Sequence, residues 1–196
     1  MTLTDAQIDR YSRQIIVPRV GGRGQERMLA ARILLAGDAR DIEAPLAYLV
    51  GAGVGTICLK LSADQAVFTE KRELNPDVSV TLADEPAGRV DLALVIVGSE
   101  AARKAASEIM QTDVRALVIA RLDAPGKIFV IPDAQSSQAV DTEFSTRSEA
   151  ADIIAMLATA EAFKLTAGYA ENPSSATIEF DGHETRVRVH ESKRSG

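Results

Sequence analysis

The chain has 196 residues, 46% of them hydrophobic and 26% charged, which is the composition of an ordinary single globular domain. Its 22 Lys and Arg residues against 28 Asp and Glu residues give a formal net charge of −6, which argues against nucleic acid or an anionic membrane as a partner. No apolar run of about 18 residues is present to span a membrane. The first 20 residues carry five charges in place of the apolar core of a signal peptide, so we expect a cytoplasmic protein.

A helical arm is expected to precede the first strand. Residues 5–19 place apolar side chains such as Ile8 and Tyr11 at near-helical spacing, and Thr4 is suited to the N-cap. The remainder of this arm, which covers residues 1–31, is predicted to be a flexible turn at 21–24 and a short helix at 25–31.

Apolar strands alternate with helices through the middle of the chain. Five short runs are predominantly apolar, which indicates strands that are buried on both faces. Such strands with helices between them predict an α/β, Rossmann-like domain, with a mostly parallel sheet and helices on both faces. We expect one helix to start at Pro45, because proline fits a first helical turn. The predicted strands are 32–37, 56–61, 78–82, 91–97 and 116–120, and the predicted helices are 45–50, 64–73 and 100–110.

The last third of the chain has a different pattern. A long apolar helix is expected to end at Gly168, because glycine commonly terminates helices. Two alternating segments then flank Asp181-Gly182, which is a strong signal for a C-terminal β-hairpin. We expect a single domain over residues 1–190. The remaining predictions are a strand at 127–131, a loop at 134–146, the long helix at 149–167, hairpin strands at 177–180 and 184–189, and a disordered tail at 191–196.

Four motifs occur in a recognisable order: Arg10-Tyr11-Ser12-Arg13-Gln14, Ala52-Gly53-Val54-Gly55, Asn75-Pro76 and Ala160–Tyr169. Together they resemble the ThiF/MoeB/HesA family, the bacterial relatives of ubiquitin-activating enzymes. Members of this family use ATP to adenylate the C-terminus of a ubiquitin-like or sulfur-carrier protein. The resemblance covers nearly the whole chain, and it implies a Rossmann-like fold and a dimer.

The expected nucleotide loop departs from the family pattern. After the first strand the chain reads Gly37-Asp38-Ala39-Arg40-Asp41-Ile42-Glu43, so only Gly37 remains of the glycines that would let backbone approach phosphate. A carboxylate about 6 Å from a phosphate costs roughly 2–3 kcal/mol at an effective dielectric of about 20. The N-terminus of the helix stabilises a bound phosphate by only about 0.3–1 kcal/mol. We therefore expect Asp38 or Asp41 to cap the following helix, and no nucleotide to bind.

Other functional positions that the resemblance implies are also altered. Leu61-Ser62-Ala63 stands where the family has an acid for the ribose, and Val97-Gly98-Ser99 stands where it has the aspartate that holds Mg²⁺. Glu100 and Asp123 remain as candidates for a displaced metal carboxylate. Cys58 is the single cysteine, which leaves no zinc-binding cysteine pairs, no disulfide within the chain and no thioester cysteine in the 134–146 loop. Cys58 is expected to be a small buried residue, and no metal is expected.

Arg13 matches the arginine that, in this family, reaches across the dimer to the partner's ATP phosphates. Arginine suits that role because its charge is permanent and its fork is bidentate. A helix-surface or dimer salt bridge is the alternative role.

Three hypotheses for function follow. The first is a pseudoenzyme that acts as a dimeric scaffold, or as the non-catalytic partner of an active family member to which it lends Arg13 in trans. The second is a divergent adenylyltransferase that uses ATP and Mg²⁺. The third is a small-molecule binding module with an acid-lined crevice beside Asp38, Asp41 and Glu43.

Overall fold

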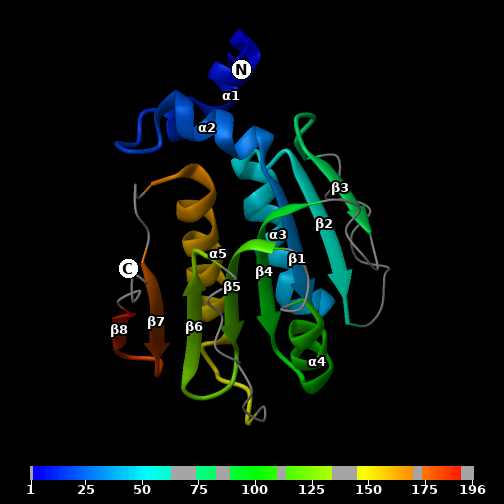
Figure 1. Cartoon of the computed structure of the whole chain (residues 1–196), viewed down its shortest axis with the longest axis vertical. Helices are drawn as coiled ribbons and strands as arrows, with labels where there is room; N and C mark the ends of the chain where they lie inside the picture. The colour runs from blue at the N-terminus through cyan, green and yellow to red at the C-terminus, as the bar shows by residue number, and fades with distance from the viewer. Residues whose placement is uncertain are drawn as a thin grey trace, which may run out of the picture.

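The computed structural model describes residues 2–62, 74–82, 89–109, 114–133, 145–169 and 174–190. Their strands are β1 (Arg32–Gly37), β2 (Thr56–Leu61), β3 (Ser79–Leu82), β4 (Val90–Val97), β5 (Val114–Arg121), β6 (Gly126–Ile131), β7 (Ser175–Phe180) and β8 (Thr185–His190). They form an eight-stranded sheet in the order β3-β2-β1-β4-β5-β6-β7-β8 (Figure 1). β1 to β5 run parallel, and β6 to β8 continue the sheet antiparallel.

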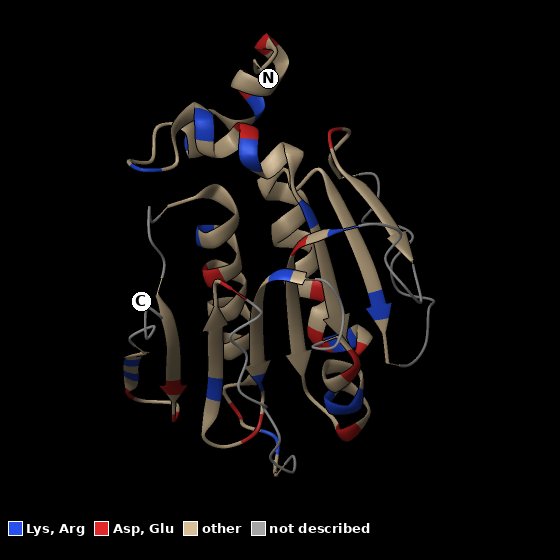
Figure 2. Ribbon diagram, in the orientation of Figure 1, with Lys and Arg blue, Asp and Glu red and all other residues tan. Residues whose placement is uncertain are grey.

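Helices cover both faces of this sheet, as its predominantly apolar strands require. On one face, Ile42 and Ile154 belong to the same buried cluster as Ile33 of β1. On the other face, Ile109 packs with Leu34 of β1. Figure 2 shows that the central strands are almost free of charged residues. The predicted α/β, Rossmann-like architecture is confirmed. The helices of the described residues are α1 (Asp5–Ile15), α2 (Gly21–Ala30), α3 (Ala39–Ala52), α4 (Glu100–Ile109) and α5 (Ala151–Ala167).

Several local predictions also hold. β1 and β2 have the predicted bounds, and the other strands differ from theirs by one or two residues. α5 ends at Gly168, whose φ of 68° lies in the left-handed region that glycine adopts without strain. β7 and β8 pair as the predicted hairpin around Asp181-Gly182. Cys58 is fully buried, as expected of a small apolar residue.

α3 begins earlier than the sequence predicts. We expected it to start at Pro45, but it starts at Ala39, and Pro45 lies inside the helix. Ile42 and Leu46 on its inner face are completely buried in the core. This burial outweighs the single hydrogen bond that the proline nitrogen cannot donate.

The arm contains a second difference. Residues 21–24, predicted to be a flexible turn, form the first turn of α2, and α1 ends at Ile15 instead of residue 19. Gly24 is buried, and a Cβ on it would lie 3.2 Å from the Ala167 carbonyl oxygen. This glycine therefore allows α2 to pack closely against the end of α5.

Three predicted segments concern residues outside the description: the helix at 64–73, the tail at 191–196 and most of the loop at 134–146. Among the helices that are described, none is long and apolar enough to cross a membrane.

Candidate functional site at the ends of the parallel strands

The candidate site lies where β1 and β4 end side by side. The chain leaves β1 into α3 on one face of the sheet and leaves β4 into α4 on the other, which creates a switch point of the kind that binds ligands in open α/β sheets. Gly37 ends β1 with a φ of 151°, and a Cβ there would lie 2.6 Å from the Ile96 carbonyl oxygen. The packing of β1 against β4 alone therefore requires this remaining loop glycine, and a phosphate site is not needed to explain it.

An internal ion pair fills the start of α3. Arg147 donates to Asp41 through two hydrogen bonds, Nη2 to Oδ1 at 2.7 Å and Nη1 to Oδ2 at 3.0 Å. The Asp41 side chain is 3% exposed and that of Arg147 is 27% exposed. The hydrogen bonds that it donates to Asp41 raise the pKa of the Arg147 guanidinium above its ordinary value. Each partner thus satisfies the other's charge with bidentate geometry.

Backbone pairing fixes the position of Arg147. Ser148 N–H donates to the Leu122 carbonyl at 2.7 Å, and Ala124 N–H donates to the Thr146 carbonyl at 3.0 Å. Arg147 itself forms an isolated bridge with Asp123. The segment before α5 is therefore held against the end of β5, and this places the guanidinium over the start of α3.

Gly98 lies directly beneath this pair. A Cβ at residue 98 would lie 1.7 Å from Asp41 Oδ2 and 2.9 Å from Arg147 Nη1. Gly98 is within the segment where the family resemblance implies the metal-holding aspartate. The space that such a side chain would need is occupied by the ion pair.

The predicted capping role of the loop acids is wrong. Asp38 occupies the N-cap position of α3, but its side chain makes no cap hydrogen bond. It accepts instead from the Ser62 hydroxyl at the end of β2. Asp41 is held by Arg147, whereas the neighbouring Arg40 is exposed. The crevice is less acidic than its sequence suggested, because Arg147 already takes the place that a cationic ligand would fill beside Asp41.

The two candidate metal carboxylates do not come together. Glu100 lies exposed at the start of α4 and accepts from Arg103 Nε at 2.9 Å. Asp123 is buried and accepts from Arg121 Nε at 3.1 Å and from the Ser145 backbone N–H at 3.3 Å. Both carboxylates are engaged by protein groups. In the part of the chain that the structure describes, no three His, Cys, Asp or Glu side chains are grouped to hold a metal ion.

Burial of Asp123 would by itself raise its pKa. The hydrogen bonds from Arg121 and from the Ser145 backbone outweigh that effect, so the pKa lies below its ordinary value. This carboxylate is accordingly a charged structural group, paired with an equally buried arginine.

The arm motif around Tyr11 anchors α1 to the domain. Tyr11 is 1% exposed. Its hydroxyl accepts from Asn75 Nδ2 at 2.9 Å and donates to Asp77 Oδ2 at 3.0 Å. Asp77 also accepts from Arg10 and Gln7. Arg10, Tyr11 and Asn75, which carry much of the family resemblance, therefore tie the arm to the loop before β3.

Arg13 is left out of this anchoring network. It is exposed in the last turn of α1 and makes no hydrogen bond or ion pair with any described residue. Figure 1 places α1 at the end of the sheet where the parallel strands begin, whereas the Asp41–Arg147 pair lies where they end. A six-residue strand such as β1 spans about 20 Å. Arg13 is therefore remote from the crevice of its own chain.

Arg147 is the site residue that sequence reasoning missed. It lies in Ser145-Thr146-Arg147-Ser148, which has no motif, and its partner is 106 positions away. Only the folding of the segment before α5 against β5 brings them together.

No protein-family model matches the chain. A segment of 123 residues is 32% identical to the SAMP-activating enzyme E1 of Haloferax volcanii and covers 51% of this chain and 45% of that protein. A segment of 58 residues is 47% identical to the sulfur carrier protein adenylyltransferase of Thermus thermophilus and covers 29% of this chain and 21% of that protein. In both cases the chain spans less than half the length of the relative it matches.

Solved structures share the fold. E. coli MccB, solved with ATP, superposes with a TM-score of 0.66 and 14% identity over 93% of this chain and 71% of that one. PaaA superposes with a TM-score of 0.62 and 15% identity over 96% of this chain and 75% of that one. At such low identity these likenesses establish the architecture alone.

Proposed function

We propose that this chain is a member of the ThiF/MoeB-like family of adenylyltransferases that does not itself adenylate. In this proposal it is a dimeric scaffold, or the non-catalytic partner of an active family member. In its sharper form, it supplies Arg13 to the ATP site of that partner.

The Asp41–Arg147 pair is the observation that carries this proposal. It occupies the start of α3, where the family resemblance implies ATP phosphates, and it fills the space beside Gly98 where that resemblance implies a metal carboxylate. A bound nucleotide would have to break the pair and leave Asp41 buried without its cation. Removing one partner of a buried pair costs about 3–5 kcal/mol. A loss of about 3 kcal/mol alone weakens binding by roughly 150-fold.

The position of Arg13 supports the sharper form. Its guanidinium is exposed and unpaired among the described residues, at the end of the sheet opposite the crevice. The arm behind it is rigidly held, since Tyr11 is buried and hydrogen-bonded. A charged group presented in this way, on an anchored helix, is suited to act on a second protein.

The test is reconstitution with an ATP-competent family member from the same organism. We expect a complex by analytical ultracentrifugation, and we expect Arg13→Ala to lower the partner's ATP–pyrophosphate exchange rate at least tenfold without changing the complex. Arg23→Ala, an exposed arginine of the same arm, is the matched control and should leave the rate unchanged. An ATP–pyrophosphate exchange rate of the complex that Arg13→Ala leaves unchanged would contradict the trans role. The absence of any complex, including a homodimer, would contradict the scaffold as well.

The names of the relatives favour a second candidate, a divergent adenylyltransferase for a ubiquitin-like or sulfur-carrier protein. It requires the Asp41–Arg147 pair to open when ATP binds. ATP–pyrophosphate exchange by the purified chain alone would establish this candidate in place of the first.

A further inference from the structure

A second concave region lies at the end of the sheet where β4 and β5 begin, opposite the end that holds the crevice. It is a cavity of about 660 Å³, within the range of about 300–1,000 Å³ typical of small-molecule sites. The C-terminal ends of α2 and α5 form its other walls. Leu92, Ala116 and Leu165 give it an apolar lining.

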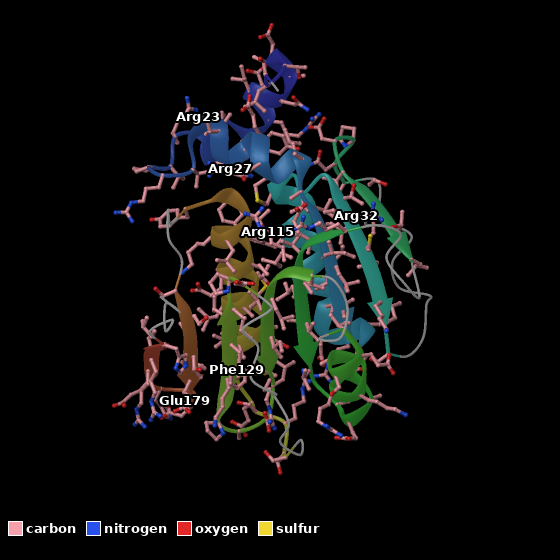
Figure 3. The ribbon with its side chains drawn as sticks, in the orientation of Figure 1. Arg23, Arg27, Arg32, Arg115, Phe129 and Glu179 are labelled. Carbon is pink, nitrogen blue, oxygen red and sulfur yellow. The ribbon has the colours of Figure 1, made fainter. Side chains whose placement is uncertain are left out.

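Two arginines line this cavity from different elements. Arg27 comes from the last turn of α2 and Arg115 from the start of β5. Figure 3 shows both at this end of the molecule, together with Arg23. The Arg115 side chain is exposed and has no hydrogen-bond or ion-pair partner in the described ranges. In a chain of net charge −6, this concentration of arginine creates a local site of opposite sign.

Arg27 is held in place by the end of α5. Its Nη1 donates to the Ala167 carbonyl oxygen at 3.4 Å. A Cβ at Gly168 would lie 1.9 Å from the same Nη1, so the guanidinium fits only because residue 168 is glycine. The remaining N–H groups of Arg27 are available to a ligand, because a guanidinium carries five donors.

Asp91 also lines the cavity and places one negative charge there against the two arginines. One of its carboxylate oxygens accepts from the Arg32 backbone N–H at 2.9 Å. At the end of α5, the Leu165 and Lys164 carbonyls accept from backbone N–H groups. At the end of α2, the Met28 carbonyl accepts from Ala31 and Gly55. An anion in the cavity would meet capped helix ends instead of bare carbonyl groups.

We propose that this cavity binds a small organic anion, with a carboxylate or phosphate group held between Arg27 and Arg115 and an apolar body packed on Leu92, Ala116 and Leu165. Arginine forks bind both head groups with bidentate hydrogen bonds, so they define the shared chemistry of the ligand. This site is separate from the Asp41–Arg147 crevice, and the proposal does not depend on whether the chain adenylates.

The test is a titration of the ¹⁵N-labelled full chain, followed by amide chemical shifts. The probes are phenyl phosphate and 3-phenylpropionate, and the neutral control is 3-phenylpropan-1-ol. We expect saturable shifts at Leu92, Ala116 and Thr166 for one or both anions, and none for the alcohol. Arg115→Gln should weaken binding by at least about tenfold, as loss of a charge-assisted contact implies. Arg188→Gln, an exposed arginine on β8, is the matched control and should have no effect.

The two anions distinguish the source of the head group. Tighter binding of phenyl phosphate would identify a phosphate ester as the ligand class, and tighter binding of 3-phenylpropionate would identify a carboxylate. Equal binding of the alcohol, shifts confined to other residues, or an affinity unchanged by Arg115→Gln would overturn the proposal. Each of those results would mean that the two arginines only neutralise the ends of α2 and α5.

Discussion

The Arg147 guanidinium lies 2.7 Å from the carboxylate of Asp41, a residue 106 positions earlier in the chain. This contact joins the segment before α5 to the first turn of α3, across the end of β4. It also explains why residue 98 is glycine, since any side chain there would overlap the pair. The contact is therefore both a structural link and the feature that fills the expected phosphate position.

We expect Arg147→Met to be strongly destabilising, by about 2–5 kcal/mol, because it leaves the buried Asp41 carboxylate without its cation. The double variant Asp41→Leu/Arg147→Met should be less destabilised than Arg147→Met alone, since apolar groups can replace a buried pair. Urea unfolding of the full cycle should give a coupling energy of about 1–3 kcal/mol.

The control for that cycle is Arg186→Met, which removes an ion pair with Glu184 in which both side chains are exposed. It should leave the free energy of unfolding nearly unchanged, because exposed pairs are screened by water. Equal effects of Arg147→Met and Arg186→Met would show that the Asp41 pair is not a structural contact.

Gly98→Ala should destabilise the chain by about 1–3 kcal/mol, because the added methyl group forces Asp41 and Arg147 apart. The same substitution in an Asp41→Ala/Arg147→Ala background should cost much less, since the three nearest obstructing atoms all belong to that pair. Thermal and urea denaturation of the four variants measure the difference. A penalty of equal size in both backgrounds would assign the role of Gly98 to backbone conformation.

Sequence patterns were sufficient to predict the sheet but not the site. β1 is apolar and buried at every position after Arg32, and this local signal identified both its bounds and its burial. The start of α3 was misplaced because Pro45 is locally a first-turn residue, whereas the burial of Ile42 and Leu46 decides where the helix begins. The partner of Asp41 could not be predicted, because Arg147 reaches it only through long-range folding. The acids of the loop therefore appeared unpaired and available for capping.

Tyr11→Phe should lower the free energy of unfolding by about 1–2 kcal/mol, because it removes the hydrogen bond that the hydroxyl accepts from the buried Asn75 and the one that it donates to Asp77. Burial raises the pKa of the Tyr11 phenol, so the hydroxyl remains a donor at neutral pH. Urea unfolding provides the measurement. Tyr48→Phe, at a residue that is 43% exposed, is the control and should change stability by less than about 0.5 kcal/mol.

Asp123 should make the free energy of unfolding depend on pH in the acidic range. Its pKa in the folded chain is below the ordinary value, so the carboxylate contributes stability above the unfolded pKa and loses it as the pH falls through the folded pKa. Asp123→Asn should cost about 3–5 kcal/mol at neutral pH, because it breaks a buried ion pair with Arg121. The difference from the wild type should shrink as the pH is lowered from about 5 to about 2. A difference that stays constant over that interval would show that the charge of Asp123 does not stabilise the fold.

The most direct test of the central claim is isothermal titration calorimetry of the purified chain with Mg-ATP at low millimolar concentration. We predict no saturable heat, because the Asp41–Arg147 pair fills the place that the phosphates and their metal would need. Saturable Mg-ATP binding would contradict the proposal, because it would show that the pair opens or moves to admit nucleotide.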